Sequence, residues 1–568
     1  MNIELTESQV AIVSALFWLA IAFGILAWLY HKKPAPLRVT LEHSKRGLER
    51  VRSTVQTVTR WNAERLKSLL FDSFDKPKVC VISNREPYIH NREGALTKLL
   101  RPASGLVSAL EPIVKACSGL WIAHGSGSAD REMSDKNGKL QVPPEKPEYL
   151  LKRVWISKED EDGYYNGFAN EGLWPLCHIA HTRPRFSEGD WNKYVKVNQQ
   201  FAKAMADEKL PGRPVVLVQD YHFALLPKLL KQNRPETLVS LFWHIPWPNA
   251  ETFGICPWRE NLLTGMLASD LIGFHTQFHC NNFFASVERF LEAKVDRETS
   301  SVTHQGHVCT IKPFPIGVDW PSPHAIEDSA FEDERLAILA EFGLPSEIKL
   351  GVGVDRADYT KGIVERFRSI ELFLELHPEW IDRFSFIQIA SPCRTKIARY
   401  AELSSEIKAT AKEINERFAY AKVPPIVLKL KQHSHEQIHK LYRAADFCLV
   451  TPLHDGMNLV AKEFVSARSD MRGVLILSHF AGAAMELDHA LLVNPYSANE
   501  CAKAIHQAIM MPPSEQAERM RIMGEQVSER NIYAWAGSFL SEISEVSRRK
   551  GLRTSLFKRE KEHLKATS

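Results

Sequence analysis

Residues 447–463 read FCLVTPLHDGMNLVAKE, and this stretch holds the pattern that decides the fold. A short apolar run, Phe447–Val450, is followed by a polar turn at Asp455-Gly456 and then by a sequence suited to a helix. A buried strand, a turn and a helix in this order form the repeating unit of a parallel α/β sheet. Polar side chains at such a turn lie at the carboxyl end of a strand, where open α/β sheets bind their ligands.

The same pattern recurs along the chain on both sides of this stretch. Short runs rich in Val, Ile and Phe predict buried parallel strands, and helical patterns separate them. The strands are expected at Lys78–Ser83, Val215–Gln219, Leu238–Trp243, Asp270–Phe274, Lys349–Val354, Phe384–Ala390, Ile426–Leu430, Phe447–Val450 and Val474–Ser478, and helices at Arg259–Ala268, Val364–Leu376 and His435–Ala445. The Pro-containing segment Lys312–His324 separates the two sets of strands. We therefore predict two Rossmann-like domains that face each other across a ligand cleft.

The composition is that of an ordinary globular protein. The chain has 568 residues, with 72 Lys and Arg against 68 Asp and Glu, for a net charge of +4. This near-neutral charge argues against a nucleic-acid binder, which would carry a basic excess. The nine cysteines are scattered without a C-x-x-C pair, which favours reduced, buried thiols and gives no ground for a metal site.

The first thirty residues predict a membrane anchor. Residues 10–30 read VAIVSALFWLAIAFGILAWLY without a charge, long enough for a helix of about 31 Å that spans the hydrocarbon layer. His31, Lys32 and Lys33 follow, and by the positive-inside rule they place the rest of the chain in the cytoplasm. We assign residues 1–33 to a single-pass anchor, 34–75 to a helical stalk and 546–568 to a basic tail. An uncleaved helix lying at the membrane surface is the alternative.

Two cations follow the first strand of the second domain. Residues 352–362 read VGVDRADYTKG, and Arg356 and Lys361 stand five residues apart across the turn. Both could converge on one anion, such as a diphosphate leaving group whose charge grows in the transition state. A solvated surface pair is the alternative.

An anion site is also predicted at the opening stretch. The backbone amides from Gly456 to Val460 would point out of the start of a helix, which is a favourable place for phosphate. Asp455 could accept hydrogen bonds from sugar hydroxyls, and Glu463 could hold a ribose by both hydroxyls. Asp455 could equally be a helix N-cap.

Polar residues also follow the strands of the first domain. Asp220 comes after VVLVQ, His244 after SLFW, and Arg85 after the first strand, in SNREP. Such positions are more often functional than structural, although an isolated histidine is usually structural. Tyr165 and Trp174, in YYNGFANEGLWP, offer an aromatic platform, with core packing as their default role.

Taken together, these segments resemble a known family. The motifs SNR, YYNxFxNxxLWP, DYH, HIPWP, VDRxDYxKG, DGMNLVAKEF, SHFAGAAMEL and VNPY stand in the order and spacing of the trehalose-6-phosphate synthases. The resemblance covers about residues 76–545, and the motifs are specific jointly although each alone is weak. It implies a retaining glycosyltransferase of the GT-B type, in which 76–325 form the acceptor domain and 326–545 the nucleotide-sugar domain.

The resemblance implies that glucose passes from a nucleotide-glucose, with UDP-glucose the expected donor, to glucose 6-phosphate, giving α,α-trehalose 6-phosphate. The chemistry is a front-face substitution that needs no protein nucleophile, no cofactor and no obligatory metal. Carried over by motif, the catalytic residues are Asp220, His244, Arg356 and Lys361. The donor-binding residues are Arg356, Lys361, Asp455, Gly456, Met457, Asn458, Leu459, Val460 and Glu463, and the acceptor-binding residues are Arg85, Tyr165, Trp174, Asp220 and Arg394.

The chain departs from the family on the acceptor side. Ser104-Gly105 stands where relatives have paired glycines, and GLWIAH, ending at His124, lacks their second Trp. Two alternatives therefore stay open: a related transferase that uses another phosphorylated acceptor such as glycerol 3-phosphate, and a catalytically silent sensor of sugar phosphate. Because no D-x-D-x-T motif follows residue 545, a separate phosphatase is expected as a partner, and a homo-oligomer is left open.

Overall fold

The computed structural model describes residues 60–73, 78–102, 105–320 and 328–566. The chain divides after Arg60, and the compact unit that begins at Trp61 carries every feature described below. The predicted membrane span, 10–30, lies outside the described residues. Within the described ranges, no helix is both long enough and apolar enough to cross a bilayer.

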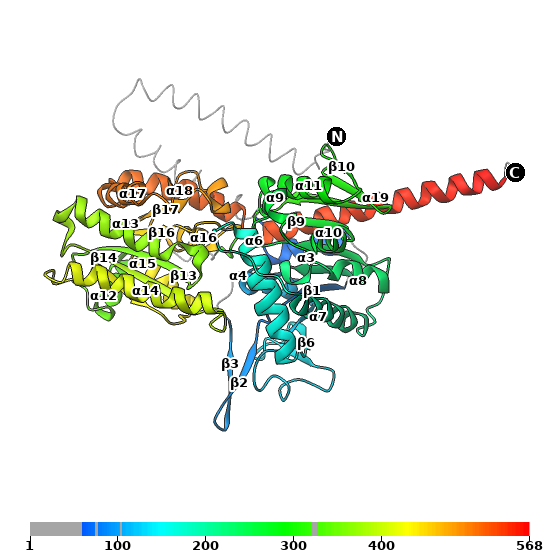
Figure 1. Ribbon diagram of the computed structural model, residues 1–568, viewed down its shortest axis with the longest axis horizontal. Coiled ribbons are helices and arrows are strands. Elements are labelled where there is room, and N and C mark those ends of the chain that lie inside the picture. Colours follow the sequence, from blue (N-terminus) through cyan, green and yellow to red (C-terminus); the bar gives the residue numbers. More distant parts are fainter. Residues whose placement is uncertain (1–59, 74–77, 103–104, 321–327, 567–568) are drawn as a thin grey trace, which may run out of the picture. The chain divides into compact units, whose positions relative to one another are not determined.

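The first half of the compact unit is built on one large sheet (Figure 1). Its described strands stand in the order β10-β11-β12-β9-β8-β7-β1-β4-β6-β5. They are β1 (Val79–Ser83), β4 (Leu120–His124), β5 (Lys139–Val142), β6 (Tyr149–Val154), β7 (Val215–Gln219), β8 (Leu238–Phe242), β9 (Leu271–Phe274), β10 (Lys294–Asp296), β11 (Ser301–His304) and β12 (His307–Pro313). The strands from β6 to β12 run parallel, with Cys80 of β1 opposite Val216 of β7, whereas β5, β10 and β11 attach antiparallel at the edges.

The second half is built on a parallel sheet in the order β15-β14-β13-β16-β17-β18. Its strands are β13 (Lys349–Arg356), β14 (Phe384–Ser391), β15 (Ile426–Lys429), β16 (Phe447–Val450), β17 (Val474–Ser478) and β18 (Leu491–Val493). Counted along the chain, this order is 3-2-1-4-5-6, and β6-β4-β1-β7-β8-β9 of the first sheet follows the same order. This is the Rossmann topology, whose switch points lie between β1 and β7 and between β13 and β16.

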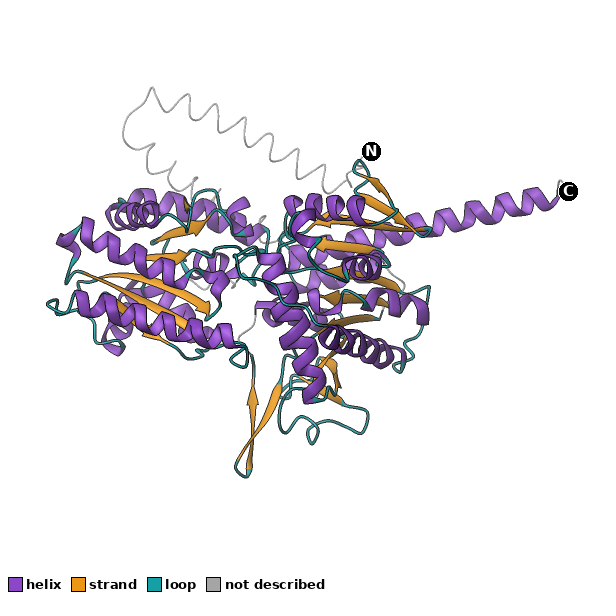
Figure 2. Ribbon diagram, viewed as in Figure 1, coloured by secondary structure: helices purple, strands orange, loops and turns teal. Residues whose placement is uncertain are grey.

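Helices cover both faces of each sheet, as Figure 2 shows in purple around the orange strands. The α-helices are α3 (Ala63–Ser73), α4 (Gly105–Ala116), α5 (Lys158–Glu161), α6 (Trp174–His178), α7 (Glu188–Ala206), α8 (Leu226–Asn233), α9 (Ala250–Phe253), α10 (Arg259–Leu267), α11 (Gln277–Phe290), α12 (Asp328–Glu341), α13 (Ile363–Leu376), α14 (Ala398–Arg417), α15 (His435–Ala444), α16 (Leu459–Ala467), α17 (Ala498–Met510), α18 (Pro513–Glu529) and α19 (Ile532–Ala566). A π-helix, η1, spans Asp162–Leu173, and four short 3-10 turns are described: η2 (Tyr221–Phe223), η3 (Tyr359–Lys361), η4 (Pro378–Trp380) and η5 (Gly482–Met485).

Alternate residues of β1 pack into two different core clusters, so both faces of the first sheet are buried at this strand. Cys80 and Ile82 belong to a core cluster with residues of α7, α10 and α11, whereas Val79 and Val81 belong to a second cluster with residues of α3, α4 and α19. A strand that is apolar at every position is what a sheet covered on two faces requires. The hairpin of β2 (Ile89–Glu93) and β3 (Leu96–Leu100) stands outside this arrangement as a separate two-stranded sheet (Figure 1).

The structure confirms all nine predicted strands and the three predicted helices, with ends that differ by at most two residues. The prediction of two Rossmann-like domains is likewise confirmed. Seven described strands of the two sheets were not predicted: β4, β5, β6, β10, β11, β12 and β18. For β6 the sequence YLLKRV explains why, since it contains two adjacent charged residues. Arg153 is fully buried there because Glu86 (2.7 Å) and Asp130 (3.0 Å) neutralise it, a pairing that the sequence pattern does not reveal.

The two ends of the compact unit meet on the first sheet. α3, which falls in the segment predicted as a stalk, packs against α4 and α19, and its Leu66 and Leu70 are buried. α19 contacts β8 and β9 of the first sheet, with Trp535 and Phe539 against Phe242. The chain that leaves the second sheet therefore returns to the first, and α19 continues through the residues predicted as a basic tail.

Candidate functional site

One cavity of about 840 Å³ lies where the switch points of the two sheets open. Its lining includes the predicted residues Arg85, Tyr165, Trp174, Asp220, His244, Arg356, Lys361, Arg394, Asp455, Met457, Asn458, Leu459, Val460 and Glu463. Gly456 is predicted with them but does not line the cavity. The volume is in the range of sites that hold a substrate-sized ligand.

Asp220 and His244 follow the neighbouring strands β7 and β8 and are tied to each other. The Asp220 carboxylate Oδ1 accepts hydrogen bonds from the backbone N–H of His244 (3.1 Å) and of Tyr221 (3.0 Å). Burial raises the pKa of Asp220 to about 7, against the pull of these bonds and of nearby arginines. Burial lowers the pKa of His244 to about 3, so its imidazole is neutral, and its Nε2 lies 2.8 Å from Gln219 Oε1.

Trp174 forms a platform for two guanidinium groups from the other half of the unit. The Cζ atom of Arg394 lies 3.9 Å from the centre of the Trp174 ring, and that of Arg356 lies 5.1 Å from it. The ring stabilises both cations, of which Arg394 is buried and Arg356 is partly exposed. The indole Nε1 of Trp174 and the Nε of Arg394 are buried without a hydrogen-bond partner among the described residues, so both remain available as donors.

Asp358 fixes Arg394 in this position. The carboxylate accepts a hydrogen bond from Arg394 (2.8 Å) and lies 3.6 Å from Arg356. Burial raises the pKa of Asp358, but the two arginines outweigh burial and hold that pKa below its usual value. Arg394 also donates to the hydroxyls of Tyr400 (2.6 Å) and Tyr221 (3.2 Å). The guanidinium is therefore oriented before any ligand arrives.

The same positive charge lowers the pKa of Tyr165. Its ring is stacked on His222, with centres 5.6 Å apart. Burial raises the pKa of Tyr165, but Arg85 and Arg394 outweigh burial and bring that pKa down to about 8. This lowered pKa indicates that the surroundings of the phenol stabilise an anion.

Lys361 and Arg356 do not face one shared anion here. Lys361 forms an ion pair with Asp455, whereas Arg356 lies beside Asp358. Burial raises the pKa of Asp455, but Lys361 outweighs it and holds that pKa below its usual value. The N-cap of α16 is Asn458, so Asp455 is not the N-cap, and the Asn458 amide donates to Asp455 at 3.2 Å.

The start of α16 presents unbonded amides to the cavity. The backbone N–H groups of residues 457–460, which line the cavity, donate to no acceptor in the described part of the chain. One turn into the helix, Glu463 lies near Tyr442, whose hydroxyl is 3.4 Å from its carboxylate, and burial raises the pKa of Glu463. Free amides at a helix start and a buried carboxylate beyond them can hold an anion and a pair of hydroxyls.

Three residues that line the cavity have strained backbone conformations. Asp220, Arg394 and Asn458 all have positive φ, at 76°, 48° and 67°. Residues other than glycine rarely adopt this region, and such strain persists where the surrounding structure holds a functional side chain in place. Gly456 makes a close approach, because a Cβ there would stand 2.4 Å from the carbonyl oxygen of His244.

The helical turn η1, a π-helix over Asp162–Leu173, positions the aromatic platform. Asn170, almost fully buried, donates to the carbonyl of Tyr165 (2.7 Å) and accepts from the hydroxyl of Tyr221 (2.8 Å). Gly167 lets α7 approach, since a Cβ would meet the Asp190 carboxyl group at 2.5 Å. π-helical turns are common at functional sites, where they re-aim side chains.

Several lining residues were missed by sequence reasoning. They are Asn84, His178, Tyr221, His222, His275, Asp355, Cys393, Lys431, Gln432, His433 and His435. Lys431 to His433 directly follow the predicted strand Ile426–Leu430, so the rule applied to the other strand ends could have found them. His275 directly follows the predicted strand Asp270–Phe274, so the same rule could have found it, whereas His178 carries no such signal in the sequence.

The departures from the family motifs lie beside the cavity or outside the described residues. His124 ends β4, and its backbone N–H donates to the carbonyl of Asn84 (3.3 Å). It does not line the cavity, and burial lowers its pKa to about 4. Its influence on a ligand would pass through Asn84 and Arg85. Ser104 lies outside the described residues.

Comparison with known proteins agrees with this geometry. The family model described as Glycosyltransferase family 20 matches residues 77–545. The chain is 34% identical to the alpha,alpha-trehalose-phosphate synthase [UDP-forming] of Botryotinia fuckeliana over 83% of this chain and 89% of that protein. It is 35% identical to the bifunctional trehalose-6-phosphate synthase/phosphatase of Thermoproteus tenax, covering 84% of this chain but only 65% of that longer protein.

Solved structures show the same likeness. One is an alpha,alpha-trehalose-phosphate synthase (UDP-forming) from Burkholderia xenovorans in complex with glucose-6-phosphate. It is 30% identical in sequence, with a TM-score of 0.71 over 82% of this chain and all of that chain.

Proposed function

The chain belongs to glycosyltransferase family 20, and from that membership we propose that it transfers glucose from UDP-glucose to glucose 6-phosphate with retention, giving α,α-trehalose 6-phosphate. The observation that carries the proposal is the gathering of Arg85, Arg356, Lys361 and Arg394 in one cavity. Both substrates of such a transfer are phosphorylated, and a leaving diphosphate gains charge as the bond to glucose breaks. Four cations beside free helix amides are suited to that chemistry.

The donor is assigned to the half of the cavity formed by the second sheet. Arg356 and Lys361 would hold the diphosphate together with the amides of residues 456–460. Lys361 now pairs with Asp455, so donor binding would redirect the lysine to phosphate and free the carboxylate to accept from glucosyl hydroxyls. Glu463 would hold the ribose.

The acceptor phosphate is assigned to Arg85, Arg394 and Tyr165, with Trp174 beneath the arginine. Arg394 needs little reorganisation, because Asp358 and Tyr400 already orient it. Bidentate guanidinium contacts suit a phosphate better than a single ammonium does.

The reaction is assigned to the space between Asp220, His244 and the diphosphate site. The departing phosphate takes the proton of the acceptor hydroxyl as the new bond forms on the same face of the sugar. Asp220 and neutral His244 would orient glucosyl hydroxyls by hydrogen bonds. We expect neither a protein nucleophile nor an obligatory metal.

Product analysis tests the proposed function. Purified protein lacking residues 1–33 is supplied with UDP-, GDP- or ADP-glucose together with glucose 6-phosphate or glycerol 3-phosphate. We expect an α,α-linked phosphorylated disaccharide from UDP-glucose and glucose 6-phosphate, identified by NMR. The Arg356→Ala variant serves as the negative control.

The other outcomes of this experiment separate the alternatives. Turnover with glycerol 3-phosphate alone would keep the donor assignment and overturn the acceptor assignment. Tight binding of sugar phosphate without any product would make the chain a sensor.

We further propose that residues 10–30 anchor the enzyme in a membrane, with the catalytic unit in the cytoplasm. The support is the uncharged stretch itself and the basic residues that follow it. We expect the full chain to stay with membranes after alkaline extraction, and the chain lacking residues 1–33 to become soluble with its activity retained. The Ala20→Arg variant tests the same stretch without deleting it. It places a charge in the middle of the span, which raises the free energy of membrane insertion by about 3 kcal/mol. Release of the full chain by alkaline extraction would instead favour a helix lying at the surface.

A further inference from the structure

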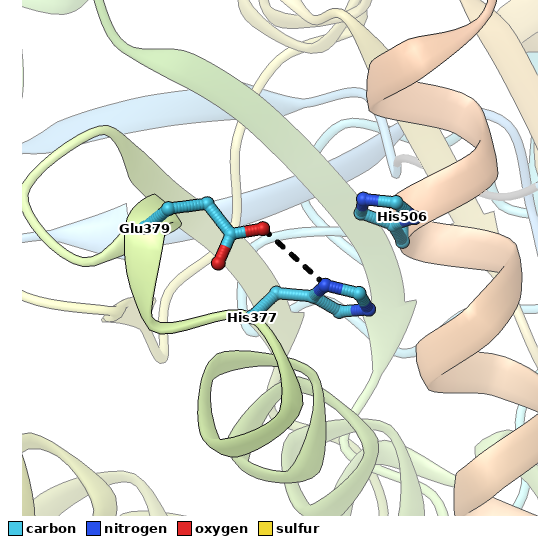
Figure 3. Close-up of side chains that lie close together, drawn as sticks. All are labelled: His377, Glu379 and His506. Carbon is cyan, nitrogen blue, oxygen red and sulfur yellow. Dashed lines mark ion pairs between the residues drawn. The ribbon is translucent and has the colours of Figure 1, made fainter.

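A second cluster of ligand-type side chains lies away from the cavity, on the helices that cover the second sheet. His377 follows α13 directly, Glu379 stands in η4, and His506 lies on α17 (Figure 3). One ligand atom from each lies within 4.8 Å of the others. None of the three lines the cavity assigned to the transfer reaction.

The tertiary structure brings these three side chains together from distant parts of the sequence. α13 and α17 pack against each other along their lengths. The rings of His377 and His506 are parallel, with an angle of 2° and centres 3.8 Å apart. The Nδ1 of His377 lies 3.4 Å from Glu379 Oε1, the ion pair drawn dashed in Figure 3.

The three side chains differ in how far they are exposed to solvent. Each histidine is half-buried, whereas Glu379 is exposed and can change its rotamer.

We propose that His377, Glu379 and His506 form a binding site for a divalent transition metal of the zinc class, completed by water. Two imidazoles and one carboxylate are a ligand set that Zn²⁺ accepts. A tetrahedral zinc ion holds its ligand atoms about 3.3 Å apart, given Zn–N bonds of about 2.0 Å. The 4.8 Å span therefore closes by rotation of the exposed Glu379 and of the two rings, which must tilt so that their lone pairs converge.

The bound ion would clamp the carboxyl end of α13 to α17. These helices cover one face of the sheet that carries Arg356 and Asp455, so the clamp stabilises the domain without entering the reaction. Because a metal that binds only the folded chain stabilises it by mass action, added zinc raises the melting temperature. This role is independent of the transferase activity proposed above.

Zinc titration of the metal-free, untagged full chain tests the proposal. We expect calorimetry with ZnCl₂ to show one site in the wild type that is absent in His506→Ala and weakened more than about tenfold in Glu379→Gln. The zinc-dependent rise in melting temperature should disappear in the same variants. Since Glu379 is exposed, Glu379→Gln leaves folding undisturbed and keeps the test valid if a histidine variant proves unstable.

The matched control is His489→Ala. His489 is also a surface histidine beside a carboxylate, with its Nδ1 2.9 Å from Asp488 Oδ1, but the described residues supply no third ligand there. This variant should bind zinc as the wild type does. Equal zinc affinity and stoichiometry in the wild type, His506→Ala and Glu379→Gln would overturn the proposal, and loss in the histidine variant alone would remove Glu379 from the site.

Discussion

Replacing Arg356 or Lys361 with Ala should lower turnover by a factor of about 10² to 10³, the loss expected when a group that stabilises developing charge is removed. Both side chains line the cavity, with Arg356 partly exposed and Lys361 more deeply buried. The effect should fall on the transfer step, because the diphosphate carries more charge as it departs than it does in the bound donor. Steady-state kinetics with varied UDP-glucose would measure the loss in turnover and in kcat/KM separately.

This experiment needs a control for stability. Lys361 is the ion-pair partner of Asp455, so its removal leaves an uncompensated charge that can cost about 3–5 kcal/mol. Removal of Arg356 leaves Asp358 paired with Arg394 at 2.8 Å. The melting temperature of each variant is therefore measured alongside its activity. Lys396→Ala is the matched control, since Lys396 pairs with Asp162 at 3.1 Å and does not line the cavity. A folded Arg356→Ala or Lys361→Ala variant with wild-type turnover would contradict the assignment.

Gly456→Ala should reduce kcat/KM by about 10², although the change adds only one methyl group. The new Cβ would stand 2.4 Å from the His244 carbonyl oxygen and 3.2 Å from a ring carbon of His275. Both neighbours belong to the first sheet's half and Gly456 to the second, so the two halves must move apart. A misplacement of about 1 Å at a reacting centre can cost this much activity.

Activity and melting temperature of Gly456→Ala are compared with those of Gly189→Ala. Gly189 lies in the first turn of α7, where an added Cβ meets only Ser187 Oγ at 3.9 Å. We expect this control to keep its activity and its stability. Near-normal kcat/KM in Gly456→Ala would show that the contact between Gly456 and His244 does not govern the spacing of the site.

The strands could be predicted because each is a short, continuous apolar run. β7, VVLVQ, and β16, FCLV, are buried at every position, and a sheet covered on both faces leaves no other arrangement for them. β6 was not predicted, because it is not a continuous apolar run. Arg153 makes it read as polar, and only the distant carboxylates of Glu86 and Asp130 allow that charge to be buried.

The positions of the candidate site residues could also be predicted, because parallel strands end at one edge of a sheet. Arg356, Asp220 and His244 were found from this rule. It failed for His178, which lies on α6 and reaches the cavity only through the packing of η1. The proposed metal site could not be predicted either, because His377 and His506 are too far apart in the sequence to form a recognisable motif.

The sequence by itself determined the two Rossmann-like sheets and the polar residues at their strand ends, because hydrophobic periodicity and chain order are local properties. Only the tertiary structure decided which charges meet. Lys361 faces Asp455 across 94 residues of chain, and Arg394 is held by Asp358 and Tyr400 above Trp174. Distances between groups this far apart in sequence, and the burial that raises the pKa of Asp220 to about 7, arise only once the chain has folded.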